Sequence, residues 1–395
     1  MARRVALVGI AFVVIGLGWL SLPRSTPPTD VDQRAAGRVP GAPAQSTPAD
    51  GRRTLTILGA GDVLVHPPVW QQARRDSTTG GFDFFPMFKH VSQTISGADL
   101  AICHMETTLA SPDGPFEGFP AFNVPPQVLQ GVKQAGFDAC STGSNHAIDH
   151  GEAGVLRAIE AFDAAKLGHT GTFRSPDQAN TPTIYVVRGV KVAHLSYSAH
   201  FDGRTRPSGM EWLANLIEPS KIIDMAKRAR EAGAEIVLLS LHWGTEYQHE
   251  PDLNQLTWGR ELIASPYIDV ILGHHAHVVQ PIEQVGGKWV VYGMGNELAQ
   301  HAKPINDNRE GIMARLTLTE EAARRWRVTK IEAIPTWVDL DPDIRLIELS
   351  RALADPRVPD DQRRIYQAAM DRIRRHLQSR NAQQSGLVLA SQRTG

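Results

Sequence analysis

Several histidines and acids stand directly after short apolar runs, and these residue types are the ones that bind divalent metals. The set comprises Asp62, Glu106, Asn145, His242, His275 and His277. Neutral imidazole suits ions of the Zn, Fe and Mn class, and a carboxylate can bridge two cations. The set is too large for one tetrahedral zinc ion. It fits two divalent ions roughly 4 Å apart, which would clamp a phosphoryl oxygen and supply hydroxide at neutral pH.

Each of these residues also has an ordinary explanation when it is taken alone. A histidine at the end of a strand is more often structural, and Asp62 after Gly-Ala-Gly is typical of a turn. The joint pattern therefore carries the prediction. Neighbouring histidines such as His104 and His274 have plausible structural roles, so we leave them out of the ligand set.

His146 follows Asn145 directly, and Asp149 lies three residues further on. We expect His146 to protonate a leaving oxygen as a general acid, a role that contributes about 10²–10⁴-fold in rate. Asp149 would orient the ring and favour its charged form. The alternative is that His146 only bonds to its loop while Asp149 caps a helix that begins near Gly151.

The elements that must position these residues are short, apolar, β-branched runs, which predict buried strands. The runs are 55–60, 100–103, 137–141, 192–196, 236–241, 268–272 and 289–292. Helical spacing of apolar residues predicts helices over 154–166 and 219–232 between them. This alternation predicts an α/β fold, in which ligands bind beyond the carboxyl ends of the strands. One site should therefore collect the polar residues.

The composition excludes several classes of protein. The 395 residues include 41 Lys+Arg and 42 Asp+Glu, so the chain is not a basic nucleic-acid binder. Its 42% hydrophobic and 21% charged residues are typical of a globular protein. Only two cysteines are present, Cys103 and Cys140. We expect two unpaired core residues there, with a disulfide in an oxidising exterior as the alternative.

The N-terminal segment has the features of a membrane anchor. Residues 5–22 carry no charge and would form roughly 27 Å of helix, enough to cross a bilayer core. Arg3 and Arg4 precede this run and predict a cytoplasmic N-terminus, with everything after Leu22 outside. A cleaved signal peptide is the alternative, although its apolar run is usually shorter.

Four regions are predicted along the chain. Residues 1–22 form the anchor, and 23–52 form a Pro/Ala-rich linker. The main domain covers 53–338, and 339–395 form a helical extension with a tail that is disordered from about residue 379. Two helices are expected in this extension, over 344–353 and 362–377. The second is arginine-rich, which indicates a solvated face or, alternatively, a contact with an anionic polymer or lipid.

The motifs in residues 54–300 resemble those of the bacterial capsule-synthesis family called CapA, which is associated with poly-γ-glutamate capsules. The motifs are Gly-Asp62-Val-Leu, the Glu106 segment, Ser-Asn145-His-Ala-Ile-Asp149-His-Gly, His242-Trp-Gly-Thr-Glu-Tyr, Gly-His-His275-Ala-His277-Val-Val-Gln and Tyr-Gly-Met-Gly-Asn296. The resemblance implies a fold related to calcineurin-like metallophosphoesterases, a sandwich of β-sheets flanked by helices.

The resemblance also implies a distribution of ligands between two metal ions. Asp62 and His277 would hold the first ion, with His66 completing it. Glu106 would bridge both ions. The second ion would be held by Asn145, His242 and His275, and His146 would be the acid beside the leaving group.

Three positions depart from the family pattern. The usual Asn-Leu-Glu reads His104-Met105-Glu106, the usual Gly-Asn-Phe has Glu297 in place of phenylalanine, and the usual proline between the last two histidines is Ala276. None of these changes removes a proposed ligand. We expect Glu297 to add charge near the substrate.

The resemblance implies a protein of capsule biosynthesis with a phosphoesterase-like, hydrolytic site, and the N-terminal segment places it on the membrane, facing outward. Its partners would be an anionic polymer or phosphoester substrate, the membrane, and capsule synthetase or export subunits, but no nucleic acid. One alternative is a non-catalytic component of polymer export or assembly. Another is an extracytoplasmic phosphodiesterase unrelated to capsule.

Overall fold

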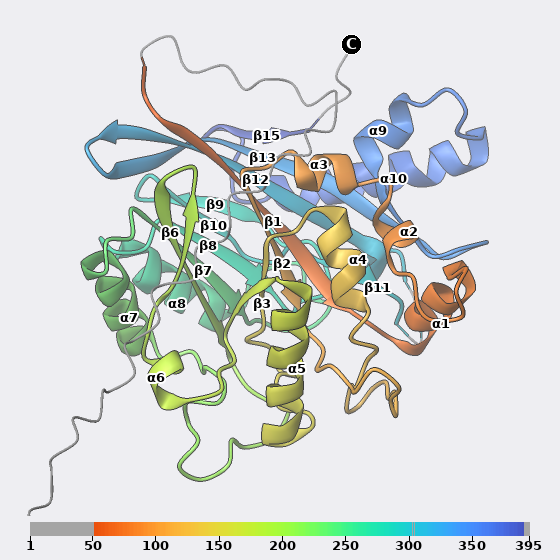
Figure 1. Ribbon diagram of the computed structural model, residues 1–395. Coiled ribbons are helices and arrows are strands. Elements are labelled where there is room, and N and C mark those ends of the chain that lie inside the picture. Colours follow the sequence, from red (N-terminus) through yellow and green to blue (C-terminus); the bar gives the residue numbers. More distant parts are fainter. Residues whose placement is uncertain (1–50, 302, 304, 391–395) are drawn as a thin grey trace, which may run out of the picture.

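A computed structural model describes residues 51–301, 303 and 305–390, and its elements follow the predicted alternation of strands and helices (Figure 1). The proposed anchor at residues 1–22, and the linker apart from residues 51 and 52, lie outside the described residues. Within the described part of the chain, we find no helix with the length and apolar character that crossing a membrane requires.

The larger of two sheets contains nine strands in the order β14-β13-β12-β1-β2-β3-β4, with β11 beside β1 and β15 beside β13. β1 to β4 run parallel to one another, and β12 runs antiparallel to β1. The strands are β1 (Thr54–Leu64), β2 (Leu100–Met105), β3 (Ala139–Ser141), β4 (Gly168–Thr170), β11 (Asn296–Ala299), β12 (Glu310–Ala322), β13 (Arg325–Asp339), β14 (Arg345–Glu348) and β15 (Leu387–Leu389).

The smaller sheet contains six strands in the order β5-β6-β7-β8-β10-β9. β6, β7, β8 and β10 are parallel, and β5 and β9 are antiparallel edge strands. The strands are β5 (Thr183–Val187), β6 (Val190–Ser198), β7 (Ile236–His242), β8 (Val270–His274), β9 (Ile282–Val285) and β10 (Lys288–Val291).

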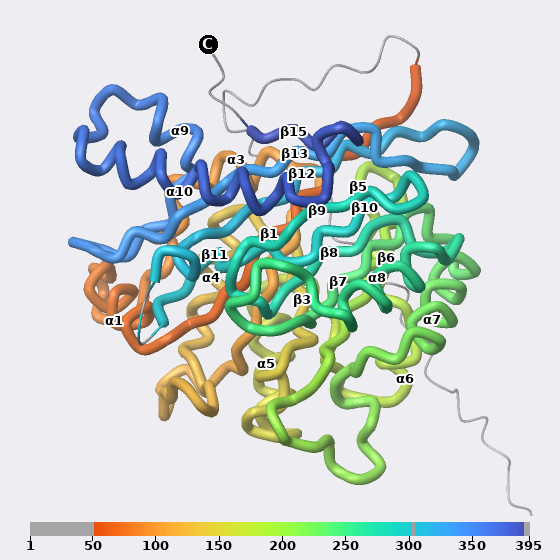
Figure 2. Tube along the Cα trace, turned by 180° about the vertical axis from the view of Figure 1, so that it is seen from behind, coloured from red at the N-terminus to blue at the C-terminus, as the bar shows by residue number. Residues whose placement is uncertain are grey.

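The two sheets pack face to face with helices outside both of them (Figures 1 and 2). Successive residues of a strand point to opposite faces, so Ile57 and Leu238 enter the core between the sheets while Leu58 and Val237 face the helices. Helices α1 to α5 cover the larger sheet, and α7 and α8 cover the smaller one. The helices are α1 (Pro67–Asp76), α2 (Phe85–Phe88), α3 (Ser92–Ser96), α4 (Val128–Ala135), α5 (Gly151–Ala165), α6 (Pro176–Ala179), α7 (Pro219–Glu231) and α8 (Leu253–Ala264).

The C-terminal region adds both strands and helices to this sandwich. Helix α10 (Asp360–Gln378) lies close to the expected range and packs its apolar face into the core between the sheets, after the short helix α9 (Leu349–Ala354). The first expected helix is only partly present, because residues 345–348 form β14 against β13. Residues 387–389 pair with β13 as β15, where the sequence predicted disorder.

Cys103 and Cys140 occupy paired positions on β2 and β3, with their Cα atoms 4.4 Å apart. Both residues are fully buried and are joined by a disulfide bond. The expectation of two unpaired core residues is therefore wrong. The alternative that the sequence left open, a disulfide, is the arrangement in the structure.

The carboxyl ends of the parallel strands from both sheets meet at one end of the sandwich. Asp62 lies at a bulge near the end of β1, and its register partner on β2 is His104. His242 ends β7, and its register partner on β8 is His274. Polar residues from the two sheets thus face one another where the strands end, as the sequence predicted.

Candidate metal centre

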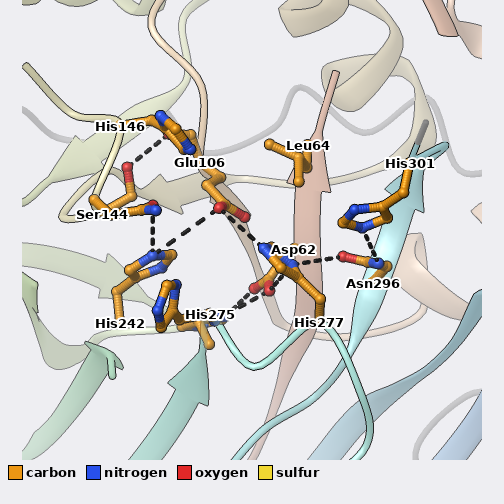
Figure 3. A network of polar contacts seen from close by, with 12 residues as sticks. Asp62, Leu64, Glu106, Ser144, His146, His242, His275, His277, Asn296 and His301 are labelled. Atoms are coloured by element: carbon orange, nitrogen blue, oxygen red, sulfur yellow. Dashed lines mark hydrogen bonds and ion pairs between the residues drawn. The ribbon is translucent and has the colours of Figure 1, made fainter. Parts of the chain in front are cut away.

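The structure brings the predicted metal ligands together in a buried cluster between the two sheets (Figure 3). Three groups of side chains could each hold an ion, and within each group the ligand atoms lie no more than 4.8 Å from one another. They are Asp62 with His104 and His274, Glu106 with His104 and His242, and Glu106 with His275 and His277. Glu106 is shared by two groups, which is the position that a bridging carboxylate would occupy.

The Glu106 carboxyl group is the least satisfied polar group of the cluster. It is fully buried, and neither oxygen has a hydrogen-bond partner among the described residues. Burial raises the pKa of Glu106 well above its usual range. Its Oε1 lies 3.5 Å from His277 Nε2 and 4.0 Å from His242 Nε2. Only a cation would compensate this carboxyl group in its ionised form, and this set of oxygen and imidazole donors fits a divalent metal ion.

Asp62 lies in the same cluster, but its pKa is shifted in the opposite direction to that of Glu106. Burial raises its pKa, but hydrogen bonds with His274 and His277 outweigh burial and hold that pKa well below its usual range. Asp62 Oδ1 lies 3.1 Å from His274 Nδ1, and its Oδ2 accepts a bond from the His275 amide at 3.1 Å. Asp62 is thus a carboxylate held rigidly by the loop that carries the last two predicted ligands.

Asn145 is oriented for metal binding by a residue that the sequence analysis did not identify. Its Nδ2 donates to Asp202 Oδ2 at 2.9 Å, so its Oδ1 points inward and lies 2.8 Å from His242 Nε2. Asp202 lies in the loop after β6, beside His200. The other ligands were found by searching for polar residues directly after each apolar run. The same search carried further into the loop after β6 would have identified His200 and Asp202.

His277 is oriented by Asn296, at the start of β11 (Figure 3). Asn296 Nδ2 donates to the Asn308 carbonyl at 2.8 Å, which turns its Oδ1 toward His277 Nδ1 at 3.0 Å. Because an amide oxygen only accepts, His277 Nδ1 carries a proton, and Nε2 is the ring atom that faces Glu106 and would bind a metal ion. Fixing the tautomer of a ligand in this way is typical of residues around metal sites.

His66 lies at the edge of the cluster. Its Nδ1 is 3.2 Å from the Leu64 carbonyl, and its ring centroid is 4.8 Å from that of His301, another residue that the sequence analysis did not identify. His301 bonds Asn296 at 3.1 Å and Tyr247 at 3.2 Å. His66 belongs to none of the three ligand groups in the described residues. Its role as a ligand of the first metal stays a prediction.

His146 and Asp149 form the expected pair, with His146 Nδ1 2.8 Å from Asp149 Oδ2. The Asp149 side chain is fully buried. It accepts a hydrogen bond from the Phe122 amide at 2.7 Å and lies 3.1 Å from an Arg204 nitrogen. Asp149 does not occupy the N-cap of α5 as the alternative expected, because that position is His150, whose side chain makes no capping hydrogen bond. The acid role of His146 stays a prediction. The Nε2 edge of His146 faces Asp202 Oδ2 at 3.7 Å.

His104 and His274, which the sequence analysis left out, lie inside the cluster. Their rings stack with centroids 4.0 Å apart, and both are almost fully buried. Burial lowers the pKa of His104 well below its usual value. A sequence signal for His104 existed, because residues two apart in a strand share a face and His104 precedes Glu106 by two.

Glu297 does not add charge near the substrate, contrary to our expectation. Its side chain is fully buried, and neither carboxyl oxygen has a partner in the described part of the chain. Burial raises the pKa of Glu297 to about 8. At neutral pH this residue is therefore a protonated, uncharged acid next to Asn296.

We expect Glu297→Gln to stabilise the protein progressively as pH rises. Between the unfolded pKa near ~4.3 and the folded pKa of about 8, the folded wild type binds more protons than the unfolded chain. Its stability therefore falls with rising pH, whereas the amide does not titrate. From about pH 5 to about pH 8 the variant should gain about 2–4 kcal/mol in free energy of unfolding over wild type.

Urea unfolding at several pH values measures this difference, with the exposed Glu160→Gln as the control. A difference between variant and wild type that stays constant with pH would contradict the assignment of Glu297.

Solved structures with similar architecture include phosphoesterases. The calcineurin-like phosphoesterase YfkN from Bacillus subtilis is 15% identical, with coverage of 82% of this chain and 99% of that chain and a TM-score of 0.46. A phosphatase from Mycoplasma pneumoniae is 13% identical, with coverage of 74% and 96% and a TM-score of 0.47.

Two curated relatives are named for capsule or PGA biosynthesis. The capsule biosynthesis protein CapA of Bacillus anthracis is 26% identical over 251 residues, covering 61% of this chain and 59% of that protein. The PGA biosynthesis protein CapA of Bacillus subtilis (strain 168) is 28% identical over 221 residues, covering 53% and 55%. The match thus spans a little over half the length of these relatives. The profile of the family described as "Bacterial capsule synthesis protein PGA_cap" matches residues 56–301, and the chain belongs to this family.

Proposed function

We propose that the chain hydrolyses a phosphoester or a related bond at a binuclear divalent-metal centre, in the synthesis or export of an anionic capsule polymer of the poly-γ-glutamate type. The observation that carries this proposal is the Glu106 carboxyl group, buried among imidazoles without a hydrogen-bond donor. The capsule relationship is supported by membership of the family and by the names of the two relatives.

The residues that would hold the ions are those of the cluster, in a calcineurin-like arrangement. Asp62 and His277 would hold the first ion, Glu106 would bridge, and Asn145, His242 and His275 would hold the second. When bound, two ions of the Mn, Fe or Zn class supply a hydroxide nucleophile and neutralise developing negative charge.

His146 is the residue placed to move a proton. Its Nδ1–H is held by Asp149, so the ring can present an Nε2–H to a leaving oxygen while Asp149 stabilises the imidazolium. Arg204 and the Phe122 amide hold the Asp149 carboxylate in place. The Phe122 ring lies edge-on to His146 with centroids 4.7 Å apart, which excludes water from that side.

Two other functions fit parts of these observations. A non-catalytic component of polymer export or assembly would need the metal ligands but not the His146–Asp149 pair. An extracytoplasmic phosphodiesterase unrelated to capsule would have the same site and a different substrate. Quantifying bound metal on the purified full-length protein, then screening phosphomonoesters, phosphodiesters and poly-γ-glutamate, separates the three functions. Absence of turnover on every substrate would favour the non-catalytic component.

We also propose that residues 5–22, outside the described residues, anchor the protein so that the main domain lies outside the cytoplasm. The membrane and capsule synthetase or export subunits would then be its partners. The basis is the uncharged run behind Arg3 and Arg4. Fractionation with protease protection tests this topology, and a released form that begins after Leu22 would rule out the anchor.

Glu106→Gln should reduce bound metal from about two ions per chain to one or none, because a bridging carboxylate contributes to both positions. Metal analysis after equilibration with Mn²⁺ or Zn²⁺ measures the stoichiometry. Glu297→Gln is a matched control, since it makes the same substitution at another fully buried, unpaired glutamate outside the three ligand groups. If both variants bind as much metal as wild type, the bridging role of Glu106 is wrong.

His146→Ala should retain both metal ions and lose about 10²–10⁴-fold in turnover on esters with poor leaving groups. Activated aryl esters need less protonation and should be affected much less. The ratio of kcat on the two kinds of ester measures the effect. His150→Ala is the control, because His150 lies close by and pairs with Glu117 at 3.5 Å. An equal loss on both esters, or loss of metal, would count against the acid role.

A further inference from the structure

Three buried side chains form a chain of contacts from the metal cluster into the larger sheet. His242 Nδ1 lies 2.9 Å from His104 Nε2, and His104 Nδ1 lies 2.8 Å from Ser141 Oγ. His104 and Ser141 are register partners on β2 and β3. None of the three is exposed beyond 1%. Every N–H and O–H of these three side chains must therefore find its acceptor within the chain of contacts or among its buried neighbours.

The far side of His242 fixes where its proton lies before a metal ion binds. Asn145 Nδ2 donates to Asp202, so the atom that faces His242 Nε2 at 2.8 Å is Oδ1, which only accepts. His242 Nε2 must then carry the proton. A neutral imidazole has one N–H, so His242 Nδ1 accepts from His104 Nε2, and His104 Nδ1 accepts from the Ser141 hydroxyl.

Metal binding at His242 requires the opposite arrangement. Nε2 must offer a lone pair, so the proton of His242 must be on Nδ1, where it faces His104 Nε2. His104 must then accept at Nε2 and hold its own proton on Nδ1, where it donates to Ser141 Oγ. The Ser141 hydroxyl then turns to the Cys103 carbonyl, 3.4 Å away. Each ring keeps one proton in both arrangements, so no proton is gained or lost.

We propose that His104 is a positioning residue that exchanges tautomers together with His242, so that His242 can present a bare Nε2 to a metal ion. This proposal rests on the metal centre of the proposed function. It assigns a role to one of the positions where this chain departs from the family pattern, since the usual residue there is asparagine.

Imidazole suits this role better than a carboxylate or an amide. A carboxylate only accepts, so it would satisfy His242 only in the metal-binding tautomer, and it would add a buried charge. An amide donates from one atom and accepts at another, so it would have to turn over when the metal binds. His104 can exchange donor and acceptor without moving, while its ring stays stacked on His274 at 4.0 Å.

Nitrogen-15 NMR of histidine-labelled full-length protein, with and without Zn²⁺, tests the exchange of tautomers. Without zinc, the spectra should show both rings protonated on Nε2, and with zinc both should be protonated on Nδ1. The signals of His104 are identified by their loss in His104→Phe. If either ring shows the same tautomer in both states, the proposal is wrong.

Zn²⁺ affinity, measured by competition with a chromophoric chelator, tests the consequence. His104→Phe keeps a ring but neither donates nor accepts, so affinity should fall about 10–100-fold while the stoichiometry at saturating zinc stays that of wild type. His194→Phe is the matched control. His194 is another fully buried strand histidine bonded to a serine, with its Nε2 2.9 Å from Ser240 Oγ.

Equal affinities for these two variants would overturn the proposal. If His104→Phe does not fold, Ser141→Ala replaces it. That variant removes the acceptor of the His104 Nδ1 proton and should weaken zinc binding several-fold. Wild-type zinc affinity in Ser141→Ala would also overturn the proposal. If wild type binds neither Zn²⁺ nor Mn²⁺ nor Fe²⁺, the proposed function fails, and the role of His104 fails with it. If wild type binds zinc and only the His104 prediction fails, the proposed function stands.

Discussion

The Glu106 carboxyl group lies where strands of both sheets end, and no hydrogen-bond donor reaches either of its oxygens in the described structure. An ionised carboxylate in this position costs several kcal/mol unless a cation compensates it. The ligand groups that share it are imidazoles rather than arginine or lysine, and His277 Nε2 faces it at 3.5 Å. Such an arrangement is poor as a permanent ion pair and well suited to a divalent ion, so the electrostatics of the whole cluster depend on this one residue.

The ligands around Glu106 are oriented by groups that do not themselves bind metal. The Asn308 carbonyl fixes the amide of Asn296, and Asp202 fixes that of Asn145. Because each anchor is an acceptor only, each determines which amide atom faces inward and hence where the neighbouring histidine carries its proton. The orientation of the site is thus set by rigid neighbours before any ligand arrives, which is the condition for tight and selective metal binding.

Much of the site could be predicted from the sequence, because the carboxyl ends of parallel strands meet at one edge and polar residues there are conspicuous. The register between strands could not. Asp62, His104 and Ser141 are successive register partners in the larger sheet, and His242 and His274 are partners in the smaller one. Register follows from packing across the whole sheet. The roles of the two set-aside histidines, and the disulfide beside His104, therefore appeared only in the structure.

The His146–Asp149 pair bears on the choice between a metal-binding component and an enzyme. A site that only binds a cation gains nothing from a histidine held beside the ligand set by a buried carboxylate. Asp149 is itself held by Arg204 and the Phe122 amide, so three elements distant in sequence cooperate to fix one imidazole. Burying that carboxylate and pairing it with a guanidinium is costly. Delivery of a proton to a leaving group, as in the proposed function, would account for this arrangement.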